Sequence, residues 1–263
     1  MKKSIIIGLF ASIALLSCSK DDSDLVKLNP DFELTVTGES PNAELSITNN
    51  STGATGYQWS LSEGASISTS SDKTPGAITV DKAGDLEVTL IVSNGSVEKE
   101  ITKTVTVTGN NAVVTYTDLE FAHDGSSDVY GRLFSFETGK MYKDSEISAE
   151  NGSLIHLAYE GWGNSLFFFE SPTVTERYDV PGATLTLVKN FVIDSIFSVD
   201  DFDALEDDSK LKDLTIIDDN NAFGNNYFPG IILFEISTGQ KGVIKAKYVN
   251  SDRIMVDIKI QKY

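Results

Sequence analysis

Apolar and polar residues alternate with a period of two in several short segments between residues 28 and 108. One buried face of a β-strand gives this pattern, because successive side chains point to opposite faces. The alternating segments are residues 32–36, 43–47, 57–61, 86–92 and 101–107, the last interrupted by Lys103. Turn-forming residues separate them, including Asn94-Gly95, a two-residue hairpin signal of type I′. The pattern predicts an antiparallel β-sandwich over residues 28–108.

A short polar break at residues 109–111 separates this segment from residues 112–263, which have a different character. Apolar strand-like runs recur there at 112–117, 129–136, 154–159, 166–169, 183–188, 231–236, 242–249 and 254–260. Two similar sequences, 134–140 and 234–241, are typical of hairpins. We expect a mainly β protein, in which the sandwich is followed by a second β-rich domain with one or two short helices.

One segment of this second domain has helical spacing. Ser198, with Asp201 three residues later, has the form of a capping box. Asp200 and Asp201 also suit the positive end of a helix dipole. The pattern predicts a helix whose acidic face, residues 200–213, is solvated. The apolar residues at helical spacing behind this start are Phe202, Leu205, Leu211 and Leu214.

Residues 1–17 have the pattern of a secretory signal peptide. Lys2 and Lys3 precede an apolar run, residues 5–16, that is shorter than the roughly 20 residues needed to span a bilayer. The run ends in Leu15-Leu16-Ser17-Cys18, which resembles a bacterial lipobox. The resemblance implies cleavage before Cys18 and acylation of this residue, so that the chain is anchored to a membrane through an N-terminal lipid. The alternative is an ordinary signal peptide that ends at Cys18.

Residues 18–27 are expected to form the acylated Cys18 and an acidic tether. Residues 19–24 read Ser-Lys-Asp-Asp-Ser-Asp and resemble the acidic export tag of surface lipoproteins in Gram-negative gut anaerobes. That resemblance implies a position on the outer face of the outer membrane. A simple solvated tether would have the same composition.

The net charge of the chain excludes some classes of binding partner. It has 263 residues with 21 Lys+Arg against 39 Asp+Glu, a formal net charge of −18. Nucleic acid is excluded as a partner, because binding phosphates needs clustered basic residues. An anionic membrane surface would also repel a protein of this charge, so the N-terminal lipid must provide the attachment to the membrane. Cys18 is the one cysteine, which excludes an intramolecular disulfide and a zinc site built on several thiolates.

Part of the first domain resembles a known extracellular module. Residues 57–64, Tyr-Gln-Trp-Ser-Leu-Ser-Glu-Gly, and residues 83–95 resemble two segments of the PKD (polycystic kidney disease) domain. Leu61 and Ser62 replace the usual Phe and Gly, and Glu63 replaces the usual Asp. The resemblance implies an immunoglobulin-like sandwich that serves as a spacer or interaction domain. Trp59, facing inward on a sandwich strand, is expected in the core.

The second domain resembles a domain that closes many surface lipoproteins of gut anaerobes, a family without a settled activity. The matching pieces are Tyr-Lys-Asp-Ser-Glu at 142–146, Ser-Pro at 171–172, Phe-Asp-x-Leu at 202–205, Gly-x-Lys-Gly at 239–242 and Val-x-Ile-Lys-Ile at 256–260. This resemblance implies a location and an architecture.

The two histidines offer little support for catalysis. His123-Asp124 lies near Ser126, but no Gly-x-Ser-x-Gly elbow and no pair of His residues at ligand spacing occurs in the sequence. His156 lies in an apolar strand-like run, where a hydrogen-bonded structural role is expected. We therefore expect a protein that is not an enzyme; a hydrolase would need a cleft with paired carboxylates of perturbed pKa.

Two loops are candidates for ligand binding. Trp162 stands between two glycines and is followed by Asn164, a composition that suits the CH faces and hydroxyl edges of sugar rings. The second loop, residues 218–230, contains Asn225, Asn226 and Tyr227. Ordinary turn composition, with the aromatic rings folded back onto the sheet, is the alternative for both. Weak candidates for oxygen ligands of Ca²⁺ in the second loop are Asp218, Asp219 and Asn221.

Together these patterns predict a non-catalytic surface lipoprotein of the outer membrane that binds polysaccharide or assists glycan uptake, with the PKD-like domain as its spacer. An outer-membrane transport complex is a second expected partner. The alternative is a structural or protein-interaction subunit of such a complex, without a small-molecule site.

Overall fold

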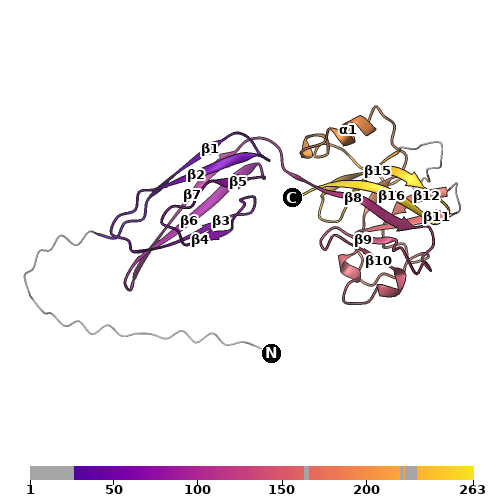
Figure 1. Ribbon diagram of the computed structural model, residues 1–263, viewed down its shortest axis with the longest axis horizontal. Coiled ribbons are helices and arrows are strands. Elements are labelled where there is room, and N and C mark those ends of the chain that lie inside the picture. Colours follow the sequence, from indigo (N-terminus) through magenta and orange to yellow (C-terminus); the bar gives the residue numbers. More distant parts are fainter. Residues whose placement is uncertain (1–26, 163–165, 220–221, 223–229) are drawn as a thin grey trace, which may run out of the picture.

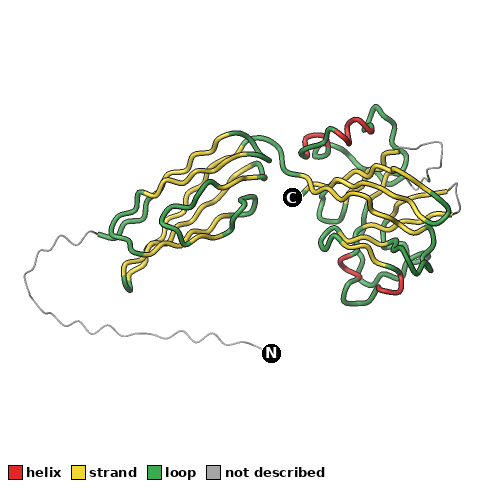
Figure 2. Tube along the Cα trace, viewed as in Figure 1, coloured by secondary structure: helices red, strands yellow, loops and turns green. Residues whose placement is uncertain are grey.

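The computed structural model describes residues 27–162, 166–219, 222 and 230–263. The described chain forms two bodies joined at residues 109–111 (Figure 1). Strands are the main regular elements of both, and the short helices lie in the second one (Figure 2). The predicted mainly β fold with antiparallel sheets and few helices is confirmed. None of the helices in the described ranges is long and apolar enough to cross a membrane.

The first body is a sandwich of two antiparallel sheets. One sheet has the order β1-β2-β5 and the other β4-β3-β6-β7. All five predicted segments are strands, and the structure adds β4 and β5, which are too short to show a period. The strands are β1 (Phe32–Thr37), β2 (Ala43–Asn49), β3 (Gly56–Leu61), β4 (Thr69–Ser70), β5 (Ile78–Val80), β6 (Gly84–Asn94) and β7 (Val97–Val107).

Trp59 lies in the core between these sheets, as predicted. Its side chain is 0% exposed, and its ring meets Phe32 edge to face at 5.2 Å. Its indole Nε1 donates a 2.9 Å hydrogen bond to the Asp72 carbonyl, so the buried polar atom has a partner. Lys103, the break in the alternation, also faces inward. Its ammonium group lies 5.2 Å from the Phe32 ring centroid and pairs with Asp31 at 2.9 Å.

The β6–β7 hairpin forms where expected, but its turn differs from the predicted one. Asn94 pairs with Val97, so the two loop residues are Gly95 and Ser96. Gly95 has a φ of +63°, whereas Ser96 is not among the residues with positive φ. A type I′ turn needs positive φ at both central residues, and a type II′ turn only at the first. The predicted type I′ turn at Asn94-Gly95 is therefore wrong.

The second body contains two antiparallel sheets around an aromatic core. The larger has the order β13-β14-β15-β16-β8 and the smaller β10-β9-β11-β12. The two similar turns of the sequence lie together, because Phe136 stacks on Phe234 at 5.0 Å. The strands are β8 (Val113–Ala122), β9 (Leu133–Ser135), β10 (Lys140–Tyr142), β11 (Leu157–Trp162), β12 (Leu166–Glu170), β13 (Leu187–Lys189), β14 (Gly230–Glu235), β15 (Lys241–Val249) and β16 (Arg253–Gln261).

The predicted helix is present but short. Helix α1 (Val199–Asp203) begins at the capping box, in which the Ser198 hydroxyl accepts the Asp201 N–H at 3.1 Å. The chain leaves the helix after Asp203, although Phe202, Leu205 and Leu211 are still buried. The described residues also contain three single-turn 3₁₀ helices: η1 (Asp144–Glu146), η2 (Gly152–Leu154) and η3 (Asp208–Lys210).

The predicted solvation of residues 200–213 is wrong for Asp208. This side chain is buried, and its carboxylate accepts hydrogen bonds from the Asn111 N–H at 2.8 Å and from Gln261 at 2.9 Å. Asn111 also accepts the Ala83 N–H of the first body through its side-chain oxygen at 3.0 Å. The polar break at residues 109–111 is thus held by hydrogen bonds on both sides.

Candidate functional site

Trp162 is the last residue of strand β11, where the sequence suggested a loop. It pairs with Leu166, the first residue of β12, and its side chain is 64% exposed. The Phe-rich strand β12 pairs with β11 and so extends it up to Trp162. The predicted loop position is therefore wrong, because Trp162 is paired in the sheet, while its ring stays mostly exposed.

The alternation along β11 separates the core from the site. Tyr159 and Gly161 face the core, whereas Glu160 and Trp162 share the other face. Gly161 permits a close approach, because a Cβ atom there would lie 2.3 Å from Nδ1 of His123. The glycine before Trp162 therefore makes room for His123 beneath the strand.

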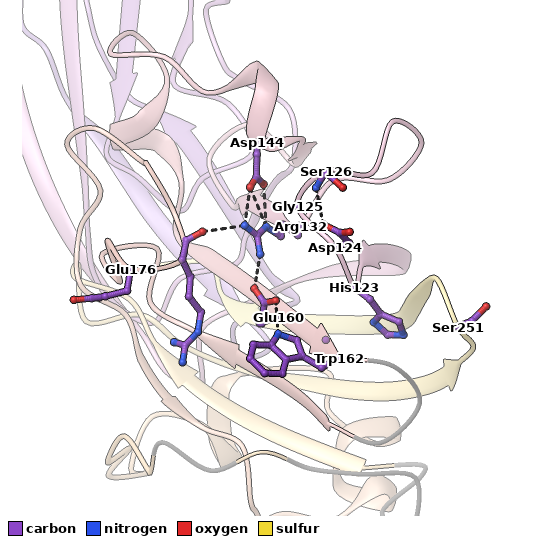
Figure 3. A pocket seen from close by; sticks show the side chains of 12 residues that line it. His123, Asp124, Gly125, Ser126, Arg132, Asp144, Glu160, Trp162, Glu176 and Ser251 are labelled. Atoms are coloured by element: carbon purple, nitrogen blue, oxygen red, sulfur yellow. Dashed lines mark hydrogen bonds and ion pairs between the residues drawn. The ribbon is translucent and has the colours of Figure 1, made fainter.

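Trp162 is oriented by a chain of charged groups (Figure 3). Its indole Nε1 donates a 2.8 Å hydrogen bond to Glu160, whose carboxylate also accepts from the Arg132 guanidinium. Arg132 in turn binds Asp144 with two nitrogens, Nε at 2.9 Å and Nη2 at 2.6 Å. Its guanidinium lies 4.7 Å from the ring centroid of Tyr178. The exposed ring thus rests on a buried ionic network.

Arg132 keeps its charge within this network. The residue is 7% exposed, and burial alone would lower its pKa. The hydrogen bond to Asp144 and the charges of Asp144 and Glu160 outweigh burial, so that the pKa of Arg132 lies above its usual value. A buried charge with paired partners in this geometry is costly to disturb.

A second aromatic ring shares the face of Trp162. Phe168 of β12 pairs with Glu160 across the sheet and is partly buried. The Arg177 guanidinium lies 5.0 Å from the Phe168 ring centroid and binds Glu170 at 2.7 Å. The outward face of this two-stranded edge therefore combines aromatic rings with guanidinium and carboxylate groups.

Trp162, Glu160 and the guanidinium groups beside them border a cavity of about 760 Å³. It is formed by the end of β8, the start of β9, η1, the end of β11 and the loops around residues 176 and 251 (Figure 3). Its lining includes two guanidinium groups and four carboxylates, those of Asp124, Asp144, Glu160 and Glu176. A volume of this size falls within the range of small-molecule sites, about 300–1,000 Å³.

His123 lines the cavity but both of its ring nitrogens are engaged. Nε2 donates to the Asn250 carbonyl at 2.7 Å, and Nδ1 accepts the Tyr159 hydroxyl at 3.0 Å. The ring stacks on Phe167 at 5.1 Å. Burial lowers the pKa of His123, although the Asn250 hydrogen bond and the charge of Asp252 act the other way. This geometry is that of a neutral histidine with a structural role.

Asp124 and His156 also have structural partners. The Asp124 carboxylate accepts the Ser126 N–H at 2.9 Å, and hydrogen bonds from Ser126 lower the pKa of Asp124. His156 lies directly before β11, and its Nδ1 accepts the Phe136 N–H at 3.2 Å. The structural role expected for His156 is confirmed.

Of the other predicted site residues, some lie outside the described part of the chain and two are hydrogen-bonded within it. Asn164, Asn221, Asn225, Asn226 and Tyr227 lie outside the described residues, as does Cys18. The carboxylate of Asp219 accepts the N–H groups of Asn190 at 3.1 Å and Phe191 at 2.9 Å, and Asp218 accepts that of Val188 at 3.5 Å. Within the described ranges, no three His, Cys, Asp or Glu side chains form a metal-binding group. Asp218 and Asp219 thus bind backbone N–H groups of β13 and of the two residues after it.

Sequence reasoning missed the network beneath Trp162. Glu160 could have been found, because it lies two residues before Trp162 and therefore on the same strand face. Arginine is rare in this chain, at positions 132, 177 and 253, and two of the three line the cavity. The burial of Arg132 between Glu160 and Asp144 depends on contacts between distant segments.

Comparisons with known proteins leave the family open. No family model matches the chain, and no curated protein matches it. A crystal structure of a DUF4466 family protein from Parabacteroides merdae is similar at 13% sequence identity and a TM-score of 0.43, covering 90% of this chain and 99% of that chain. The function is therefore argued from the site.

Proposed function

We propose that this protein is a lipid-anchored surface protein of the outer membrane that binds glycans without catalysis, with the first sandwich as a spacer. The observation that carries the glycan-binding proposal is Trp162, an exposed ring held by a hydrogen bond to Glu160 at the edge of a cavity of about 760 Å³. An exposed aromatic ring with a fixed orientation loses little conformational entropy when a ligand stacks on it.

The chemistry around the ring suits a sugar. The CH face of a pyranose can stack on the indole, and its hydroxyl groups can donate to carboxylates or accept from guanidinium groups. Both kinds of partner line this cavity, including Glu176 and Arg177. Such a mixture of one apolar surface and a few polar groups is typical of sites that fix a ligand's orientation.

The charge of the site favours neutral sugars. Four carboxylates against two guanidinium groups give the cavity an acidic balance, and the chain carries a formal net charge of −18. Sulfated or uronate-rich glycans would be repelled by this field, as would nucleic acid. We therefore propose neutral polysaccharide as the ligand class.

The proposed location rests on residues 1–24, which lie outside the described part of the chain. The lipobox ending at Cys18 and the acidic residues after it support a lipid anchor and outward export. More than one acyl chain on an N-terminal Cys would hold the protein firmly, because each buried CH₂ contributes about 0.8 kcal/mol. This arrangement would present the second body to extracellular glycans and to an outer-membrane transport complex.

A glycan array tests the binding proposal. The soluble form starting at Ser19 is applied beside Trp162→Ala and Phe191→Ala; Phe191 is an exposed aromatic residue outside the lining of the cavity. We expect neutral glycans to bind the wild type and Phe191→Ala, and Trp162→Ala to lose about 1–2 kcal/mol of binding free energy. Trp162→Phe, which keeps a ring but lacks Nε1–H, should lie between. Equal binding by Trp162→Ala and wild type would refute the site.

Membrane fractionation tests the anchor. Cys18→Ala should be absent from the membrane fraction or keep its signal peptide, and it should incorporate no labelled palmitate. A variant that is processed and bound to the membrane like the wild type would contradict the lipoprotein proposal.

One observation favours the alternative of a protein-interaction subunit. Leu166, 40% exposed and paired with Trp162, adds an apolar side chain to the exposed strand ends, and aromatic anchors are common at protein interfaces. In that case the array would show no ligand, and Trp162→Ala would release the protein from an outer-membrane complex in pull-down experiments.

A further inference from the structure

The cavity beside Trp162 is the first of three cavities in the second body that share lining residues. A cavity of about 360 Å³ shares His123, Asp124 and Ser251 with it. A third, of about 340 Å³, shares Val129 and Tyr130 with the second. The three cavities adjoin one another, because each shares lining residues with the next.

Tyr130 lines both the second and the third cavity. The Arg253 guanidinium lies 4.6 Å from the Tyr130 ring centroid and is itself held by Glu120 through a 2.7 Å ion pair. The backbone N–H of Tyr130 donates to the Ser127 hydroxyl at 3.1 Å. Beside it, Val129 is 71% exposed. This ring is therefore fixed in place next to an exposed apolar side chain.

An arginine–glutamate pair contacts the ring at both sites, but through different members of the pair. Glu160, paired with Arg132, accepts the indole N–H of Trp162, whereas Arg253, paired with Glu120, lies over the ring of Tyr130. Arg132 and Arg177 line the first cavity, and Arg253 contacts Tyr130, which lines the other two. Two separated rings of this kind suit a ligand that repeats along its length.

The segment between the two rings is polar and acidic. Asp124 and Asp252 line the second cavity together with Ser127 and Ser251, and among the described residues no Lys or Arg lines it. Carboxylates and hydroxyl groups accept hydrogen bonds from sugar hydroxyls but repel anionic groups. An extended apolar or anionic ligand would not fit this stretch.

We propose that the three cavities form one groove, bounded by Trp162 and Tyr130, that binds an extended neutral oligosaccharide with a separate stacking position at each ring. This inference rests on the proposed glycan-binding function and adds the length of its ligand. A terminal sugar would occupy the first cavity alone, whereas an internal stretch of a polysaccharide chain would occupy all three.

Calorimetric titration of the soluble chain from Ser19 tests this proposal with disaccharides and hexasaccharides of three neutral series: malto-, cello- and manno-oligosaccharides. In the series that binds, the hexasaccharide should bind about tenfold more tightly than the disaccharide. Trp162→Ala should weaken binding of both lengths. Tyr130→Ala should remove the preference for the longer ligand, and Phe191→Ala should preserve it.

Tyr130→Leu is the second variant, because it keeps apolar bulk under Arg253 but cannot stack on a sugar. It should also lose the length preference while melting close to the wild type. A wild type without a length preference, or a preference that survives in both Tyr130 variants, would overturn the extended groove while leaving glycan binding at Trp162 intact. Failure of all three series to bind at either length would refute the proposed function itself, and the groove with it.

Discussion

The hydroxyl of Tyr263 donates a 2.5 Å hydrogen bond to the carboxylate of Asp81, although 182 positions separate the two residues. Lys262 binds the same carboxylate at 2.6 Å. Asp81 directly follows β5 of the sandwich, whereas Tyr263 lies beyond β16 of the second body, and the C-terminal end is drawn at the junction (Figure 1). This contact fastens the two bodies beside the connection at residues 109–111.

The contribution of this Asp81 contact to the stability of the fold should depend on pH. Burial alone would raise the pKa of Asp81, but hydrogen bonds from Lys262 and Tyr263 outweigh it and hold the pKa below its usual value. A carboxylate whose pKa is lowered on folding stabilises the fold above its unfolded pKa, and this contribution disappears as the pH falls through the folded pKa. We expect Asp81→Asn to lower the melting temperature at pH 7 and the difference from wild type to shrink below about pH 4. Glu87→Gln, on the exposed face of β6, is the control. A difference that is constant between pH 7 and pH 3 would contradict the assignment.

Truncation of the two tryptophans should change the free energy of unfolding by very different amounts. Trp59→Ala should lower the free energy of unfolding by about 3–5 kcal/mol, because it leaves a cavity in the closed core of the sandwich. Trp162→Ala should change it by less than about 1 kcal/mol, because this ring is mostly exposed. Urea unfolding measures both. A large loss in Trp162→Ala would make this ring a structural element and remove the main support for the binding site.

Arg132 should be more important for stability than the neighbouring Arg177. Arg132→Met would leave the buried Glu160 carboxylate without its cation, at a cost of about 3–5 kcal/mol. Arg132→Lys keeps the charge but cannot bridge Asp144 and Glu160 with a planar fork, so an intermediate cost is expected. Arg177→Met, which removes a guanidinium that is more exposed, should cost about 1 kcal/mol or less. Equal stability of Arg132→Met and Arg177→Met would show that the network contributes nothing.

The first body should fold without the second. Its core consists of residues between Leu28 and Val107, so the fragment 27–109 retains every buried apolar side chain of that core. Circular dichroism should show an all-β spectrum with a cooperative thermal transition. The fragment should melt below the intact chain, since it lacks the Lys262 and Tyr263 contacts with Asp81. A disordered spectrum would place the boundary elsewhere.

The alternation of apolar and polar residues was sufficient to predict most of the strands. Trp59 was recognisable as a core residue because its neighbours on β3 alternate as it does, and the strand pairs along its whole length. The helix after Ser198 was predicted too long for a reason that lies elsewhere in the sequence. Lys259 of β16 donates 2.8 Å hydrogen bonds to the carbonyls of Phe202 and Leu205, which provides partners for the end of α1 and lets the chain turn.

The candidate site was likewise predictable from the sequence only in part. The flanking glycines of Trp162 agree with its exposed ring, but the loop predicted there is the end of strand β11. The ionic support beneath this ring was not predictable, because Arg132 binds both Asp144 and Glu160, and the pairing of β9 with β11 brings these distant segments together. Asp208 shows the same limit, since its burial depends on Asn111 and Gln261.

The inward-facing Lys103 has a consequence for self-association. It lies on β7, an eleven-residue strand at the edge of its sheet, and such long edges are open templates for strands of other molecules. A copy that extended this sheet would have to close the sandwich over the Lys103 ammonium group, which is satisfied here by Asp31 of its own chain. An inward-pointing charge on an edge strand disfavours pairing with another molecule, so we expect Lys103 to oppose edge-to-edge aggregation of the first body.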